Sequence, residues 1–139
     1  MRLRQLLIVT ALLVGCVING NAKGYRPAKI YMFGFASSFN DSIVYLTDIQ
    51  TVNAYLVNNR TKFLANREDY SYQLRNYLQS NGLEAYPTCI TMFAENEKDA
   101  TKKYLKLKER YEKSKKKYSI KSLKDSQFKY TPVEPDQQS

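Results

Sequence analysis

Histidine and tryptophan are both absent from the 139-residue sequence. Without an imidazole, no Ser-His-Asp or Cys-His arrangement can activate a nucleophile, and the usual imidazole-based zinc sites are excluded. Glycine is scarce, with five residues, and none has the GxxxxGK or GxGxxG spacing of phosphate-binding loops. The sequence therefore predicts no catalytic residues of these classes, no metal site and no cofactor.

Cysteine is nearly absent as well, since Cys16 and Cys89 are the only two. Cys16 lies in the N-terminal apolar segment, so a single chain has no disulfide framework. Cys89 lies in an apolar, strand-like run, where a free cysteine is typically a small buried hydrophobic residue. The sequence favours that role over a reactive thiol.

Only one apolar run is long, and it lies at the N-terminus. Arg2 and Arg4 precede an apolar run from residue 6 to residue 18, which is shorter than the ~20 residues of a membrane span. A basic start, an apolar middle and small residues after it are typical of a secretory signal peptide. We expect residues 1–22 to be this peptide, removed after Ala22, and the protein to reach the periplasm or cell envelope.

The same segment contains a second processing signal. The letters LVGC at residues 13–16 have the order of a lipobox, which would make Cys16 a lipidated N-terminus and the protein an outer-membrane lipoprotein. The apolar run continues through Ile18, however, whereas a lipoprotein usually turns polar directly after its cysteine. The sequence therefore favours cleavage after Ala22, with lipidation of Cys16 as the alternative.

Strand patterns dominate the first half of the chain. Residues 29–39 and 43–52 both alternate with a period of two and are joined by a short polar turn, which predicts a β-hairpin. Residues 54–57 continue the second strand or form a short third one. The aromatic strip on one face of the first strand comprises Tyr31, Phe33 and Phe35. We expect it to be core, with a sugar- or peptide-binding surface as the alternative.

The second half alternates between helical and strand patterns. Residues 61–81 have helical spacing and end at Gly82, residues 86–94 alternate as a strand, and Asn96 can cap a second helix. The apolar stripe of that helix consists of Ala100, Tyr104, Leu107 and Tyr111. Residues 127–131 are the predicted last strand.

The order β-β-α-β-α-β predicts an α+β fold. We expect a two-layer sandwich in which a mainly antiparallel sheet carries both helices on one face. One domain spans residues 23–131. The polar residues 132–139, with two prolines, are expected to be a disordered tail.

Positive charge is concentrated in the C-terminal third. Loss of Arg2 and Arg4 lowers the net charge from +9 to +7, and residues 102–117 hold nine Lys or Arg against two Glu. In an exported protein, such a segment favours anionic lipid head groups or acidic polysaccharide as partners, or an envelope protein, over nucleic acid. The alternative is a solvated helix face without a ligand. The candidate residues for binding an anion are Lys102, Lys103, Lys106, Lys113, Lys115, Lys116 and Lys117.

Carboxylates are the remaining candidates for catalysis. Asp41, Asp48, Glu68 and Asp69 lie beside turns or at a helix start, where turn formation and helix capping account for them. We therefore expect a non-enzymatic accessory or binding module. The alternative is a secreted, carboxylate-dependent enzyme acting on glycans, which requires two of these groups to converge on one cleft.

The stretch KIYMFGFASSFNDSIVYLTDIQ, residues 29–50, resembles small exported proteins of Bacteroidetes-type bacteria. The resemblance covers most of residues 29–131. It implies export and gives no activity or site residues.

The two processing signals predict different masses for the mature protein. We expect a chain that begins at Lys23, without Cys16 and without lipid, because the polar residues before the cut end in the small residue Ala22. Intact-mass measurement of the protein from its native host tests this. A mass that includes Cys16 with acyl chains would contradict it, as would a Cys16→Ser variant that leaves the membrane fraction.

Overall fold

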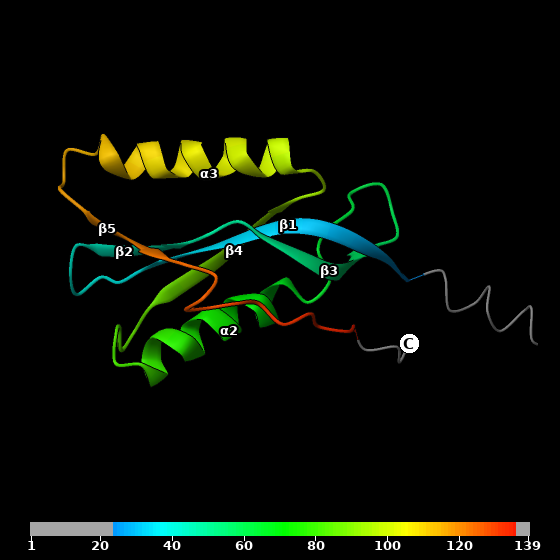
Figure 1. Cartoon of the computed structure of the whole chain (residues 1–139), viewed down its shortest axis with the longest axis horizontal. Coiled ribbons are helices and arrows are strands. Elements are labelled where there is room, and N and C mark those ends of the chain that lie inside the picture. The colour runs from blue at the N-terminus through cyan, green and yellow to red at the C-terminus, as the bar shows by residue number, and fades with distance from the viewer. Residues whose placement is uncertain (1–23, 136–139) are drawn as a thin grey trace, which may run out of the picture.

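A computed structural model describes residues 24–135. The expected signal peptide, Cys16 and residues 136–139 lie outside this range. The described chain forms one five-stranded sheet and two helices (Figure 1). The elements are β1 (Tyr25–Ser37), β2 (Ile43–Thr47), β3 (Gln50–Val57), α2 (Arg67–Ser80), β4 (Thr88–Ala94), α3 (Glu97–Glu112) and β5 (Ser119–Leu123). The predicted α+β class and mainly antiparallel sheet are confirmed.

Strand β1 organises the sheet, because three strands pair with it in antiparallel orientation. β3 pairs along residues 25–32 and β2 along residues 35–37, and β4 pairs along residues 31–37. β5 then joins the free edge of β2 in parallel orientation. β2 and β3 thus form one long, interrupted partner strand, in which residues 54–57 continue β3, one of the two arrangements that the sequence predicted.

A one-residue slip separates β2 from β3. Phe35 is opposite Leu46, whereas Met32 is opposite Gln50, so the β2–β3 side contains one extra residue. Such an insertion is a β-bulge, which leaves a backbone group without its ladder partner. Here the Gly34 N–H donates instead to Oγ1 of Thr47 at 2.8 Å.

The two helices cover opposite faces of the sheet, with α3 above it and α2 below it in Figure 1. The prediction that both helices lie on one face, in two layers, is therefore wrong. The chain crosses the sheet from β3 to β4 through α2 and returns from β4 to β5 through α3. Two parallel crossovers of the same hand that run in opposite directions place their helices on opposite faces.

Alternation along β1 supplies both cores. Ile30 and Met32 point to the α2 face, where they pack with a cluster that includes Leu74. Phe33 and Phe35 point to the α3 face and are almost fully buried. Their rings lie 5.4 Å from Tyr104 and 4.8 Å from Tyr111, respectively, on α3. The predicted core role of the aromatic strip is confirmed for these two phenylalanines, and so is the predicted stripe of α3.

Helix α2 begins later than its pattern suggested. Asn66 has a left-handed backbone with φ of 59°, so regular helix starts at Arg67 rather than at residue 61. The C-terminal end matches the prediction, because Gly82 has φ of +66° and its N–H donates to the Gln79 carbonyl. Glycine takes this conformation without a Cβ penalty.

The predicted last strand at residues 127–131 is wrong, since the final strand is β5. Residues 128–131 alternate inward and outward as a strand does, but two glutamine side chains replace a neighbouring strand. Gln50 donates to the Phe128 carbonyl and accepts from the Tyr130 N–H, each at 2.8 Å. Gln73 makes the same pair of bonds with Thr131.

The domain also extends further than predicted. The Val133 N–H donates to the Tyr70 hydroxyl at 2.9 Å, and Pro135 is buried. Residues 132–135 therefore belong to the domain rather than to a disordered tail. Among residues 24–135, no helix has the length and apolar character to cross a membrane.

Gly34 lies where the C-terminal segment crosses β1, and it predicts a measurable defect. A Cβ at this position would lie 2.1 Å from the Tyr130 hydroxyl and 2.8 Å from Leu74. Gly34→Ala should lower the free energy of unfolding by about 1–3 kcal/mol through overpacking. Urea unfolding followed by circular dichroism would measure this.

Tyr130→Phe provides the control for this clash. The Tyr130 hydroxyl is buried without a hydrogen bond within the described residues, so its removal alone should leave the stability unchanged or raise it. Combined with Gly34→Ala, it should restore part of the lost stability. Equal losses in the single Gly34→Ala and the double variant would contradict the contact.

Candidate functional site

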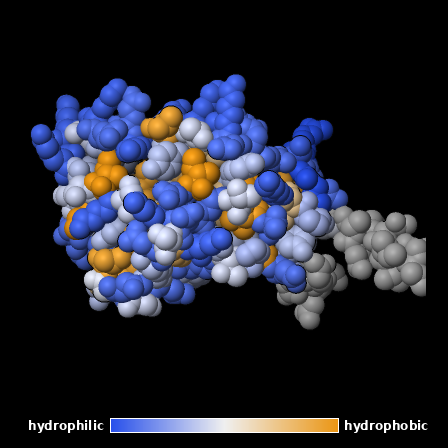
Figure 2. Space-filling model, viewed as in Figure 1, coloured by the Kyte–Doolittle hydropathy of each residue, from blue (hydrophilic) through white to orange (hydrophobic). Residues whose placement is uncertain are grey.

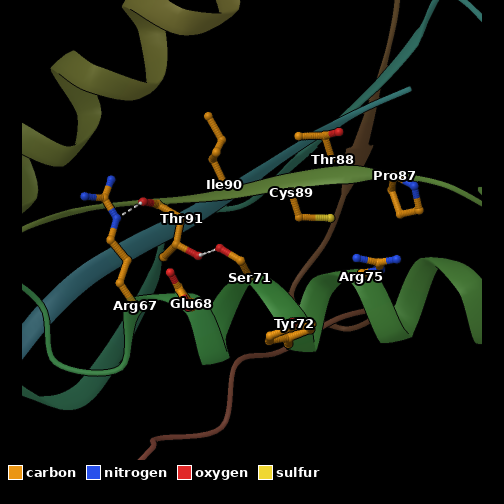
Figure 3. Close-up of a pocket in the computed structure, with 10 residues that line it drawn as sticks. All are labelled: Arg67, Glu68, Ser71, Tyr72, Arg75, Pro87, Thr88, Cys89, Ile90 and Thr91. Carbon is orange, nitrogen blue, oxygen red and sulfur yellow. Dashed lines mark hydrogen bonds between the residues drawn. The ribbon is translucent and has the colours of Figure 1, made fainter. Parts of the chain in front are cut away.

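A groove of about 560 Å³ lies between α2 and the edge strand β4 (Figure 3). Its lining comes from one face of the helix and one segment of the strand with the residue before it: Arg67, Glu68, Ser71, Tyr72 and Arg75 from α2, Pro87, and Thr88, Cys89, Ile90 and Thr91 from β4. Its volume lies within the range of small-molecule sites, about 300–1,000 Å³.

One wall of the groove is an open strand edge. β4 pairs with β1 only, so its other edge has no neighbouring strand within residues 24–135. The Thr91 carbonyl points to this open side, because it accepts a hydrogen bond from Arg67 Nε at 2.8 Å. Successive residues of an antiparallel strand alternate between the two edges. The N–H and C=O of Cys89 therefore point outward as well, together with the Thr91 N–H.

Two basic side chains cap the open edge of β4 at Thr91 and beyond. Arg67 from α2 caps the Thr91 carbonyl, and Lys103 from α3 caps the Phe93 carbonyl at 2.9 Å. Both charged groups also lie 5.6 Å from the centre of the Phe93 ring. Capping an edge with charged side chains limits pairing with other chains, so only the part of β4 before Thr91 remains open.

The other wall is a polar stripe on α2. Arg67, Ser71 and Arg75 are four residues apart and share one helix face, which spans about 12 Å. Ser71 and Thr91 share a hydrogen bond of 2.8 Å between their hydroxyls, which joins the two walls. Within the described residues, no ion pair joins Arg67 or Arg75 to a carboxylate. The groove therefore presents unpaired positive charge, with Glu68 near its Arg67 end (Figure 3).

Cys89 points from β4 toward α2 and Arg75 (Figure 3). The side chain is partly buried and packs against the α2-face core. Burial raises the pKa of its thiol to about 11, and the nearby positive charge of Arg75 only partly opposes this. A protonated thiol is a poor nucleophile. The predicted role as a small hydrophobic residue fits this environment better than a reactive one.

Chain comparisons with protein-family models, with curated proteins and with solved structures find no match.

The carboxylates considered for catalysis have local contacts. Asp41 accepts from the Ile43 N–H in the β1–β2 turn, and Asp48 accepts from the Asp125 N–H beside the bulge. Asp69 accepts from the Asn66 side chain at the start of α2. Glu68 alone lines the groove. No group of three or more metal-ligating acidic or thiol side chains occurs within residues 24–135.

The basic segment lies on and after α3. The apolar stripe of α3 packs on the sheet, and all seven predicted lysines are exposed. Figure 2 shows mostly hydrophilic residues over α3, at the top of the view. Lys102, Lys106, Lys115 and Lys117 have no ion pair within the described residues.

Three of the predicted lysines have local contacts. Lys113 forms an ion pair with Glu109, one turn earlier on α3. Lys116 lies over the ring of Tyr118 at 5.3 Å. Lys103 thus has a structural role at the edge of β4, which the other predicted binding lysines do not share.

The sequence did not reveal the groove. Arg67 and Arg75 lie eight residues apart on the predicted helix, and no local pattern places them beside a strand edge. The signal that could have marked them is the combination of a polar stripe on this helix with a strand that pairs along one edge only.

The raised pKa of Cys89 predicts slow alkylation in the folded protein. At pH 8, most of the thiol is protonated, whereas a free cysteine with a pKa of ~8.5 is partly ionised. Iodoacetamide should therefore react at least about tenfold more slowly with the mature protein than with the same protein in 6 M guanidinium chloride. The rate should still rise about tenfold per pH unit between pH 8 and pH 10. A rate that levels off near pH 8.5 would show an unshifted thiol.

Proposed function

We propose that this protein is a non-enzymatic binding module of the cell envelope, which is exported and holds anionic groups against the lysines of α3 and of the loop after it. The proposal rests on one observation: the apolar side chains and the lysines of α3 have different roles. The apolar stripe is used in packing on the sheet, while Lys102, Lys106 and residues 115–117 remain exposed. Packing therefore accounts for the helix but not for its charge.

This segment has many more basic than acidic side chains, so its positive charge is not neutralised within the segment and supports binding of an anion. Residues 102–117 hold nine basic and two acidic side chains, and one of the two acids, Glu109, already pairs with Lys113. Lysine side chains on an exposed surface attract anionic lipid or polysaccharide with about 1 kcal/mol per residue, and the attraction weakens as salt increases. Several unpaired lysines together would therefore give binding that salt reverses.

Anionic lipid and acidic polysaccharide both present negative charge to exposed lysines, so the experiment has two arms. One uses vesicles of phosphatidylglycerol and phosphatidylcholine in a 1:1 mixture, and the other uses immobilised heparin as a model acidic polysaccharide. The arm in which the protein binds at 50 mM but not at 500 mM NaCl identifies the source of the anion. Binding in neither arm would reject the proposal.

The lysines of the loop after α3 predict a charge-specific loss. The triple variant Lys115→Gln, Lys116→Gln and Lys117→Gln should weaken binding about tenfold or more, because each lysine contributes about 1 kcal/mol. Vesicle co-sedimentation and heparin-column elution would measure this.

A matched variant controls for net charge. Lys29, Lys124 and Lys129 are exposed and lie outside the basic segment, so changing these three to Gln removes the same charge elsewhere. The control should bind almost as well as the unchanged protein. Equal losses in the two triple variants would show a response to net charge alone and contradict a defined surface.

A further inference from the structure

We propose that the groove between α2 and β4 binds an extended acidic peptide of another protein, which adds as a strand to the open edge of β4. This inference does not depend on the proposed function, because the groove and the loop at residues 115–117 lie at opposite edges of the sheet. β4 forms one edge, and β5, which follows the loop, forms the other.

The backbone of β4 supplies the first part of the argument. Cys89 offers both its N–H and its C=O to the open side, and Thr91 offers its N–H. An added strand recognises such alternate donor and acceptor groups through its main chain. Arg67 and Lys103 occupy the next two outward carbonyls, so pairing is limited to the segment Pro87–Thr91. This segment accommodates a short peptide of about five residues, about 17 Å long.

Charge supplies the second part. Arg67 and Arg75 flank the groove about 12 Å apart along α2. In an extended peptide, side chains at positions i and i+4 lie on one face about 13 Å apart. Two acidic residues with this spacing can therefore reach both arginines. Glu68 offsets the charge at the Arg67 end, so Arg75 is the stronger of the two contacts.

Two other occupants fit less well. A small anion would contact the arginines but leave the backbone groups of Cys89 unused. A second copy of this chain would bring another pair of groove arginines and, in its expected mature form, a net charge of +7 against +7. Like charges placed together across an interface oppose association. Tyr72, which is 55% exposed on the groove wall, adds an aromatic surface of the kind that peptide contacts use.

The test uses a defined probe, the acetylated and amidated peptide TEVTVET labelled with fluorescein, whose glutamates have the i and i+4 spacing. Fluorescence anisotropy should show saturable binding to the mature protein. Two matched peptides separate the two parts of the argument. TQVTVQT lacks the charge, and a TEVTVET peptide N-methylated at its three central residues lacks the backbone donors. Each should bind at least about tenfold more weakly.

Protein variants locate the site. Arg75→Gln should weaken binding about tenfold, whereas Arg60→Gln, an exposed arginine outside the groove, should have no effect. Amide NMR shifts caused by the peptide should include Cys89 and Thr91. The triple lysine variant at residues 115–117 should bind the peptide normally, which separates this test from that of the proposed function.

Several outcomes would overturn the inference. Equal binding of the N-methylated peptide would show an anion site without strand addition. Equal effects of Arg75→Gln and Arg60→Gln would place the peptide elsewhere. Sedimentation equilibrium that shows a dimer at the concentrations of the assay, lost in Arg75→Gln, would identify a second copy of the chain as the occupant.

Discussion

The structure depends on the second half of β1, residues 31–37, which lies between strands on both edges and is mostly buried. Three strands use it as their ladder partner, and its alternating side chains supply one core for each helix. A strand in this position tolerates no bulky residue where another segment crosses it closely. At Gly34 the absent side chain admits the Tyr130 ring, while the N–H bonds to Thr47 across the bulge. One residue thus joins the C-terminal segment, the bulge and α2.

The two faces and two edges of the sheet have different roles. Because the crossovers run in opposite directions, each helix covers one face and neither is free to act only as a ligand surface. α3 combines a docked apolar stripe with exposed lysines, so packing holds its charges in place. α2 instead turns a polar stripe toward the edge strand β4, and this forms the groove. The positive charge is therefore divided between two separate surfaces.

The open edge of β4 is protected only in part. Arg67 and Lys103 reach it from opposite faces of the sheet and meet at the Phe93 ring. These contacts restrict unselective pairing at one end and leave the segment before Thr91 accessible. An edge that is closed at one end and charged along its wall selects for short partners of opposite charge.

The sequence by itself determined the local elements. Period-two alternation located the hairpin and β4, the Asn96 cap and apolar stripe located α3, and Gly82 located the end of α2, because each signal depends on neighbouring residues only. Tertiary structure decided the rest. The placement of α2 and α3 on opposite faces follows from crossover direction, which no local pattern encodes. Residues 128–131 alternate as a strand does, yet Gln50 and Gln73 take the place of its partner. The groove likewise needed long-range pairing, because only the sheet order leaves β4 with one free edge beside Arg67 and Arg75.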